Sequence, residues 1–355
     1  MNLFPKKIAV FSRLNITNYG DPIIADCCEY IIKKTAKEEH VRIKTKQVDL
    51  YLDDPNKMEK ELAGYNTVVY PGGGLNSVKF NLRIMDIMKV LEKNAKAKVF
   101  FNAVGILRVN PKEKNENLLR QMFTHPLVKQ VTTRGDFKRL VETIIDHNIP
   151  GQYPPCLVFD PAIWADETYQ VNKNADSEIV GIGVIRPEIF EENGNDLSVD
   201  DIYNMYIGII EELDRRSIKW KLFTNGMKKD YEVITRILGK LNLDEEEYAV
   251  PNPANRVELV SNISEFKGVI AARMHANIIA TSLGIPSVGL VWNDKMNLFG
   301  EIIGSPDRYI SGEKLKDYKY LVDKLEVAIA EGYDKEIIEK TKKKTVETIR
   351  NIIRG

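Results

Sequence analysis

Arg273 and His275 lie one residue apart, with Met274 between them, in a stretch that is otherwise apolar. Arginine offers a permanently charged, forked donor for phosphate and carboxylate groups. Histidine can deliver a proton near neutral pH. The pair would therefore suit a reaction that holds an anionic substrate and protonates it. The structural alternative is that Arg273 pairs with a surface carboxylate and His275 caps a helix.

The residues around this pair predict a strand, a turn, a helix and a second strand. Val269–Ala272 is a short apolar run typical of a buried strand. Ala276–Leu283 is typical of a helix that ends at Gly284, and Ser287–Val291 is a second apolar run. This order predicts a parallel sheet. Ligands of such sheets bind beyond the carboxyl ends of the strands, where helix N-termini favour anions.

Other polar or glycine residues also follow expected strands. They are Asn18, Gly20 and Asp21 after Lys7–Phe11, Gly72, Gly73 and Gly74 after Asn66–Tyr70, Arg134 after Lys129–Thr133, Asp160 after Cys156–Phe159, and Lys295 after Ser287–Val291. Asp21 is placed to cap a helix over Asp21–Lys34, and the glycines would allow a ligand to approach the backbone. Each group has a structural alternative: a capped turn, a tight strand-to-helix passage, or an ion pair for Arg134.

The chain alternates strands and helices along most of its 355 residues, which exceed the usual size of one core. Further strands are expected at Arg42–Val48, Lys98–Ala103, Glu178–Ile185, Lys219–Phe223 and, as a short strand, Tyr248–Val250. Further helices are expected at Arg83–Asn94, Phe137–Ile145, Val199–Arg215, Lys229–Leu241, Asn255–Ser261, Met296–Ile303, Leu321–Ile329 and Lys335–Ile353. The polar segment Asp166–Ser177 resembles a linker. We expect domains over residues 1–165 and 166–325, followed by a C-terminal helix over 326–355.

Composition indicates a cytoplasmic globular protein without a metal. The formal net charge is zero, which argues against nucleic acid as a partner. No apolar run is long enough for a membrane span or a signal peptide. The three cysteines and four histidines (His40, His125, His147 and His275) lack disulfide or zinc spacing. The lysines of the last helix are expected on a solvated face, or else in a weak contact with an anionic membrane surface.

Taken together, these motifs resemble the polysaccharide pyruvyl transferase family, from about Asn18 to about Ile303. The most specific part is Arg273-Met274-His275, followed by Gly284-Ile285-Pro286, Lys295 and Phe299. The resemblance implies an α/β, glycosyltransferase-B-like fold with parallel sheets. Two Rossmann-like domains would face a cleft, with the acceptor side in the N-terminal domain and the donor side in the C-terminal domain. It also implies transfer of the pyruvyl group of phosphoenolpyruvate to two hydroxyls of a hexose. The products are a cyclic ketal and phosphate, and no cofactor is needed.

The resemblance also implies roles for individual residues. Arg134 and Arg273 match the donor-binding arginines, Met274 a backbone contact to the donor, Lys295 a further donor contact, and His275 the general acid. For the general base we favour Asp21, with Asp160 as the second candidate. The sequence departs from the family at Gly135, where many relatives carry an acidic residue. Here Asp136 follows one position later, which leaves its role open.

Two alternatives to this function stay open. One is a nucleotide-sugar-dependent glycosyltransferase of the same fold, and the other is a non-catalytic anion-binding relative. The expected partners are phosphoenolpyruvate and a sugar acceptor, either a free oligosaccharide or one linked to a lipid. Contact with the membrane is expected to be peripheral at most, on its inner face. The sequence specifies neither the acceptor sugar and its linkage nor the oligomeric state.

Overall fold

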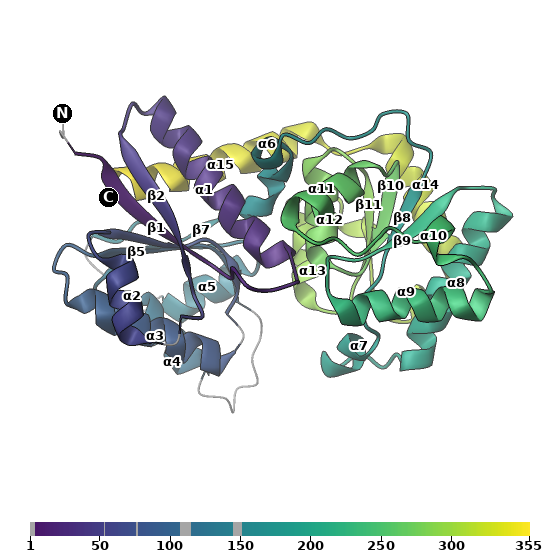
Figure 1. The fold of residues 1–355 in the computed structure, drawn as a ribbon, viewed down its shortest axis with the longest axis horizontal. Helices are drawn as coiled ribbons and strands as arrows, with labels where there is room; N and C mark the ends of the chain where they lie inside the picture. The colour runs from purple at the N-terminus through teal and green to yellow at the C-terminus, as the bar shows by residue number, and fades with distance from the viewer. Residues whose placement is uncertain (1–3, 53, 76, 107–114, 145–150) are drawn as a thin grey trace. The chain divides into compact units, whose positions relative to one another are not determined.

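The computed structural model describes residues 4–52, 54–75, 77–106, 115–144 and 151–355. The chain divides into two compact units (Figure 1). The first unit comprises Met1–Asn15, Ile24–Pro161 and Glu339–Gly355, and the second comprises Ile16–Ile23 and Ala162–Ile338. Each unit therefore contains one segment from the far side of the expected boundary after residue 165.

The first unit is built on a parallel sheet with the strand order β2-β1-β3-β5-β6-β7, and β4 pairs with β5. Its strands are β1 (Lys6–Ser12), β2 (Ile43–Asp49), β3 (Thr67–Tyr70), β4 (Gly73–Gly74), β5 (Lys98–Gly105), β6 (Val128–Thr133) and β7 (Cys156–Leu157). Its helices are α1 (Gly20–Glu38), α2 (Pro55–Leu62), α3 (Val78–Glu92), α4 (Asn115–Phe123), α5 (Phe137–Ile144) and α15 (Lys335–Arg354), of which α1 and α15 begin in residues of the second unit.

Helices cover both faces of this first sheet (Figure 1). On one face, Phe101 of β5 packs in a buried cluster with residues of α2, α3, α4 and α5, and its ring lies 5.3 Å from that of Phe123. On the other face lie α1 and α15, where Gln130 of β6 donates to the carbonyl of Thr348 in α15. Burial on both faces explains why β1, β3 and β5 contain apolar runs in the sequence, whereas the edge strand β2 carries lysines.

The second unit is built on a parallel sheet with the order β12-β11-β10-β8-β9. Its strands are β8 (Val180–Gly183), β9 (Trp220–Phe223), β10 (Gly268–Ala271), β11 (Ser287–Leu290) and β12 (Tyr309–Ile310). Its helices are α6 (Ala165–Tyr169), α7 (Glu188–Glu192), α8 (Val199–Arg215), α9 (Lys228–Leu241), α10 (Glu245–Tyr248), α11 (Arg256–Ser264), α12 (Met274–Ser282), α13 (Asp294–Ile302) and α14 (Tyr318–Glu331). Short 3-10 helices are η1 (Pro161–Trp164), η2 (Pro306–Arg308) and η3 (Gly312–Lys316). Helix α12 packs with α11 and α6, and α14 packs with α8 (Figure 1).

Several expected elements need correction. The strand expected at Tyr248–Val250 is wrong, because Asp244 caps α10 and that helix runs through Tyr248. Only Ala249 forms a bridge, to Leu222 of β9. The expected linker Asp166–Ser177 begins inside α6. The expected C-terminal helix over 326–355 consists of the end of α14 and the whole of α15.

Other differences concern helices that the sequence did not predict and residues that lie outside the description. Helices α2, α4 and α7 are not predicted from the sequence, because each has at most nine residues and so gives only a weak helical period. Ile145, the expected last residue of one helix, and His147 lie outside the described residues. Across the described part of the chain, no helix has the length and apolar character needed to cross a membrane.

Candidate functional site

Arg273 lies at the carboxyl end of β10 and immediately precedes α12. Its side chain is only 14% exposed and pairs with Asp230 of α9, with Nε 2.8 Å and Nη2 2.7 Å from Oδ2. Nη2 also lies 3.0 Å from the sulfur of Met227. The arginine thus pairs with a carboxylate, as the structural alternative predicts, but that carboxylate is buried rather than on the surface.

Asp230 joins the ends of two neighbouring strands of the second sheet. Its Oδ2 accepts hydrogen bonds from the guanidinium of Arg273, which follows β10. Its Oδ1 accepts the backbone N–H of Arg186, just after β8, at 3.0 Å. Burial raises the pKa of the Asp230 carboxyl above its usual value, and the positive charge of Arg273 opposes that shift. Because a buried carboxylate needs partners for both oxygens, this arrangement fixes the orientation of the guanidinium.

His275 lies in the first turn of α12 and is 8% exposed. Gly20, the first residue of α1, lies directly against its ring: a Cβ added to Gly20 would lie 2.7 Å from the Cβ of His275 and closer still to the imidazole. A glycine is therefore required for this close approach. Asp21 follows in the first turn of α1, so it does not cap this helix as the sequence predicts. The helix starts earlier than expected because Asn18 and Tyr19 already supply carbonyl acceptors to Asp21 and Ile23.

The segment around Asn18 is fixed to the carboxyl end of β9. The backbone N–H of Tyr19 donates to the carbonyl of Asn225 at 3.1 Å, and its hydroxyl donates to the carbonyl of Ala254 at 2.7 Å. Gly226, with φ +105°, allows the contact, because a side chain there would overlap Thr17 and the Tyr19 ring. Of the expected site residues, Asn18, Gly20, Asp21, Arg273, Met274, His275 and Lys295 therefore belong to one unit.

Lys295 lies in the first turn of α13, after β11. Its Nζ is 4.4 Å from the centre of the Trp292 ring. Trp292 is buried, and its Nε1 donates to the carbonyl of Ala272 at 2.7 Å. The tryptophan therefore connects the end of β11 to the residue before Arg273, and it acts as a core residue that also positions Lys295.

In the first unit, Arg134 and Asp160 form an ion pair at the ends of β6 and β7, with side chains 6% and 1% exposed. The backbone N–H of Arg134 also donates to the carbonyl of Val104 at 3.3 Å. Arg134 therefore forms an ion pair, as its structural alternative predicts. Its partner is Asp160, the second candidate for the general base. Asp136 accepts the backbone N–H of Arg139 at the start of α5, which gives it a helix-capping role.

The three consecutive glycines lie beside Arg134. Gly72 and Gly73 have φ values of +142° and +103°, which side chains rarely allow. Gly73 and Gly74 form β4 and pair with Val104 and Gly105 of β5. A Cβ added to Gly105 would lie 3.6 Å from the Arg134 Nε. The positive φ values therefore favour glycine at positions 72 and 73, and a Cβ at Gly72 would also lie only 3.0 Å from the Ile24 side chain.

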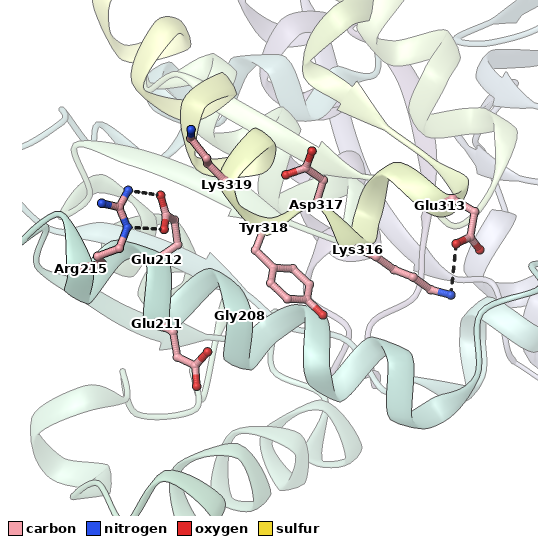
Figure 2. A pocket seen from close by; sticks show the side chains of 9 residues that line it. All are labelled: Gly208, Glu211, Glu212, Arg215, Glu313, Lys316, Asp317, Tyr318 and Lys319. Carbon is pink, nitrogen blue, oxygen red and sulfur yellow. Dashed lines mark hydrogen bonds and ion pairs between the residues drawn. The ribbon is translucent and has the colours of Figure 1, made fainter.

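Two cavities in the second unit contain none of the expected site residues. One, of about 710 Å³, is lined by Gly208, Glu211, Glu212, Arg215, Glu313, Lys316, Asp317, Tyr318 and Lys319 (Figure 2). In it, Arg215 pairs with Glu212, and Lys316 with Glu313. The other, of about 510 Å³, lies between β9, α10 and α11. Among the described residues, no three His, Cys, Asp or Glu side chains are grouped so that they could hold a metal.

Asp230 is the site residue that the sequence interpretation missed. Its position did carry a signal: the buried face of α9 consists of Asp230, Val233, Ile234, Ile237 and Leu238, so a carboxylate occupies an otherwise apolar helical stripe. A charge on such a stripe needs a buried partner. The sequence does not specify which cation that is.

Comparison with known proteins identifies the family. Residues 18–294 match the model of the polysaccharide pyruvyl transferase family, and the chain belongs to that family. No curated protein matches the chain. Family membership makes the protein a transferase that acts in polysaccharide pyruvylation in general terms, and it implies a sugar acceptor.

Solved structures with the same fold are UDP-GlcNAc 2-epimerases. That of Methanocaldococcus jannaschii has a TM-score of 0.62 at 13% identity, covering 99% of this chain and 100% of that one. The enzyme from Neisseria meningitidis, bound to UDP-GlcNAc, has a TM-score of 0.57 at 13% identity, covering 97% and 99%. A putative epimerase from Listeria monocytogenes has a TM-score of 0.57 at 14% identity, covering 96% and 91%. At such identities the likeness concerns the fold, and it confirms the expected glycosyltransferase-B-like class.

Proposed function

We propose that the protein transfers the pyruvyl group of phosphoenolpyruvate to two hydroxyls of a sugar in a polysaccharide or its precursor, giving a cyclic ketal and phosphate. The observation that carries this proposal is the turn after β10. There, Arg273 is held by the buried Asp230, and His275 lies two residues later against Gly20. This turn lies within the segment that matches the family.

The donor is a small molecule with a phosphate and a carboxylate, so its site needs several cations and N–H donors. Arg273, the backbone N–H of Met274 and the N-terminus of α12 supply them at one strand end. Lys295 adds a charge after the next strand, and Arg134 is the contribution that we assign to the first unit. The residues Asn18, Gly72, Gly73 and Gly74 are assigned to loops that contact substrate.

The chemistry begins with a proton. His275 protonates the methylene carbon of the donor, and the adjacent carbon becomes cation-like and is attacked by one sugar hydroxyl. The second hydroxyl displaces phosphate at the same carbon and closes the ketal. One of the two hydroxyl protons restores the protonated His275. The other is accepted first by Asp21, the proposed base, and then leaves with phosphate. The scheme uses no cofactor and no metal.

Phosphate release from phosphoenolpyruvate, measured across a panel of glycosides, tests the reaction. In deuterium oxide the ketal methyl group should carry one deuterium. His275→Gln should lower turnover by about 10²–10⁴-fold, the usual contribution of a positioned acid. The thermal shift caused by phosphoenolpyruvate should persist in that variant. Unchanged phosphate release in His275→Gln would remove the histidine from the mechanism.

A nucleotide-sugar-dependent glycosyltransferase is the second candidate, because the structural relatives include an epimerase solved with UDP-GlcNAc. Thermal stabilisation separates the two functions. Stabilisation by phosphoenolpyruvate alone supports pyruvyl transfer, whereas stabilisation by UDP-GlcNAc alone supports the second candidate. Stabilisation by phosphoenolpyruvate without turnover on any acceptor would indicate the non-catalytic relative.

A cytoplasmic location, with peripheral membrane contact at most, completes the proposal. Helix α15 buries Thr345, Thr348, Ile349, Ile352 and Ile353. Its lysines Lys340, Lys343 and Lys344 are exposed, which favours the solvated face. Cell fractionation at low and high salt tests this, because electrostatic membrane contact is lost at high salt.

A further inference from the structure

The cavity of about 510 Å³ in the second unit lies between β9, α10 and α11 (Figure 1). We call it the Glu245 cavity, after a carboxylate of α10 that lines it. From the sheet, its lining includes Ile179 and Phe266, which precede β8 and β10, and Lys221 within β9. These residues come before the carboxyl edge at which Arg273 lies. The cavity is therefore separate from the candidate active site, and its volume is that of a small-molecule site.

Part of the lining of the Glu245 cavity is apolar and rigid. Phe266 is buried, and the centre of its ring lies 5.1 Å from that of Phe223. Gly181 of β8 allows this packing, because a Cβ there would overlap the Phe266 ring. Val250 and Pro251 add further apolar surface. A ligand can therefore bury carbon groups here.

The charged part of the lining is mainly acidic. Among the described residues that line the cavity, three carry a carboxylate, namely Glu245, Glu246 and Glu265, and one, Lys221, carries an ammonium group. Glu245 and Glu246 are consecutive residues of α10, which packs against β9 and α9. The formal charge of the lining is thus negative.

Neutral donors hold two of these carboxylates. The hydroxyl of Tyr231 donates to Oε1 of Glu245 and that of Thr235 to Oε2, each at 2.9 Å. Burial, together with the Glu245 charge, raises the pKa of Tyr231 to about 12, so this hydroxyl keeps its proton. Glu265 accepts the side-chain amide of Asn174 at 2.8 Å. These partners orient the carboxylates without adding a positive charge that would offset theirs.

The lining therefore suits an organic cation. Three carboxylates and one ammonium group attract positive charge and repel anions. Tyr231 also lines the cavity, and the face of an aromatic ring attracts a cation. Within the described part of the chain the carboxylates do not form a group that could hold a metal ion. The apolar lining instead favours a cation that carries carbon groups.

We propose that the Glu245 cavity binds a small organic amine. Its ammonium group pairs with Glu245 and Glu246, and its apolar part packs against Phe266 and Val250. The described lining shares no residue with the turn that contains Arg273 and His275, so this proposal does not depend on the proposed function.

Ligand-observed NMR on the full chain tests the proposal with four probes that differ in one feature each. Phenethylamine carries an ammonium group and an aromatic ring. Phenethyl alcohol replaces the ammonium by a hydroxyl, hydrocinnamate replaces it by a carboxylate, and ethylamine lacks the ring. Phenethylamine should bind most tightly of the four, and its binding should weaken as salt is added.

Two variants change the charge of the cavity in opposite directions. Glu245→Gln/Glu246→Gln keeps the shape of both side chains, and it should weaken phenethylamine binding by about tenfold, the effect of one lost charge-assisted hydrogen bond. Lys221→Met removes the positive charge and should tighten binding by about threefold, as for one partly exposed charge pair. The matched control is Glu247→Gln, which removes an exposed carboxylate of α10 from outside the described lining. It should leave the affinity unchanged.

Far-UV circular dichroism shows whether each variant is folded. The proposal is overturned if wild-type protein binds phenethylamine no more tightly than any of the other three probes, or if the folded double variant binds it like wild type. Should the double variant fail to fold, Lys221→Met decides, and unchanged or weaker binding in that variant overturns the proposal. Because these measurements use no phosphoenolpyruvate, such a failure leaves the proposed function unaffected.

Discussion

Two neighbouring residues, Asp230 and Gly20, determine how the side chains of Arg273 and His275 are positioned. Asp230 holds the guanidinium through Nε and Nη2, and Gly20 leaves room for the imidazole. In the proposed function, where Arg273 binds an anionic donor, Asp230 would have two opposing effects on that binding: it orients Arg273, but it also offsets part of its charge. Since two-point binding of a phosphate or carboxylate depends on geometry, we expect orientation to dominate.

Replacing Asp230 by asparagine tests that balance. Asp230→Asn keeps the shape and one acceptor but removes the charge, so Arg273 loses part of its fixed orientation. We expect the KM for phosphoenolpyruvate to rise by about tenfold, comparable to one charge-assisted hydrogen bond, with a much smaller change in kcat. The control is Asp200→Asn, an exposed carboxylate in the first turn of α8. Tighter donor binding would show instead that Asp230 acts mainly by offsetting charge.

Gly20 provides a second test at this scale. A methyl group at Gly20 must displace the His275 ring or the start of α1. Gly20→Ala should therefore lower turnover by about 10²-fold or more, as for a misplaced acid. Gly239→Ala is the matched control, because this glycine also lies in a helix but a Cβ there meets no atom within 4 Å. That control should keep full activity and gain up to about 1 kcal/mol of stability. Equal activity in both variants would contradict the role of Gly20.

The sequence singles out three of the candidate residues for a physical reason. Arg273, His275 and Lys295 interrupt or follow apolar runs, and such positions can be seen in one dimension. Contacts between distant segments cannot, so the packing of Gly20 against His275 and the choice of Arg273 as the partner of Asp230 required the fold. Asp21 is the second residue of α1 and not its N-cap, because carbonyls of Asn18 and Tyr19 start the helix before it.

At the scale of elements, strands were predicted more reliably than short helices. Strands such as β10 and β11 are buried on both faces and so appear as apolar runs. The segment Tyr248–Val250 predicts a strand because tyrosine and valine are frequent in strands. The acidic first turn and the Asp244 cap instead favour the helix α10 that the structure contains. Helix α15 was predicted within two residues at each end.

The docking of α15 onto the first sheet predicts a pH effect. Lys6 donates to the carbonyls of Ile352 and Ile353 at the end of α15, at 3.0 and 3.1 Å. Burial, together with the nearby charge of Lys98, lowers the pKa of Lys6 from 10.5 to about 8. Between these values the unfolded chain binds more protons than the folded one, so the contribution of Lys6 to stability rises with pH and is smallest below about pH 8.

The measurement compares wild type with Lys6→Met. The difference in the free energy of unfolding between them should shift in favour of wild type as the pH rises from about 7.5 to about 9.5. Denaturant unfolding at several pH values gives this difference, and taking it cancels the groups that both proteins share. A difference that is constant over this range would mean that the pKa of Lys6 is not lowered by folding.

At the scale of the whole molecule, the chain passes between its two units four times, after Asn15, Ile23, Pro161 and Ile338. Two of these passages lie inside the continuous helices α1 and α15. Melting either helix therefore removes structure from both units. All three tryptophans (Trp164, Trp220 and Trp292) belong to the second unit, so tryptophan fluorescence reports on that unit alone.

Ile349→Ala, in the part of α15 that belongs to the first unit, tests whether the units unfold together. Ile349 is fully buried, and its truncation should cost about 2–5 kcal/mol. Because α15 is continuous, we expect the fluorescence transition of the second unit to shift together with the transition seen by far-UV circular dichroism. Ile234→Ala, a buried isoleucine of α9 in the second unit, is the matched control and should shift both signals as well. A fluorescence transition left in place by Ile349→Ala would show that the second unit unfolds independently, and that the shared helices break where they pass between units.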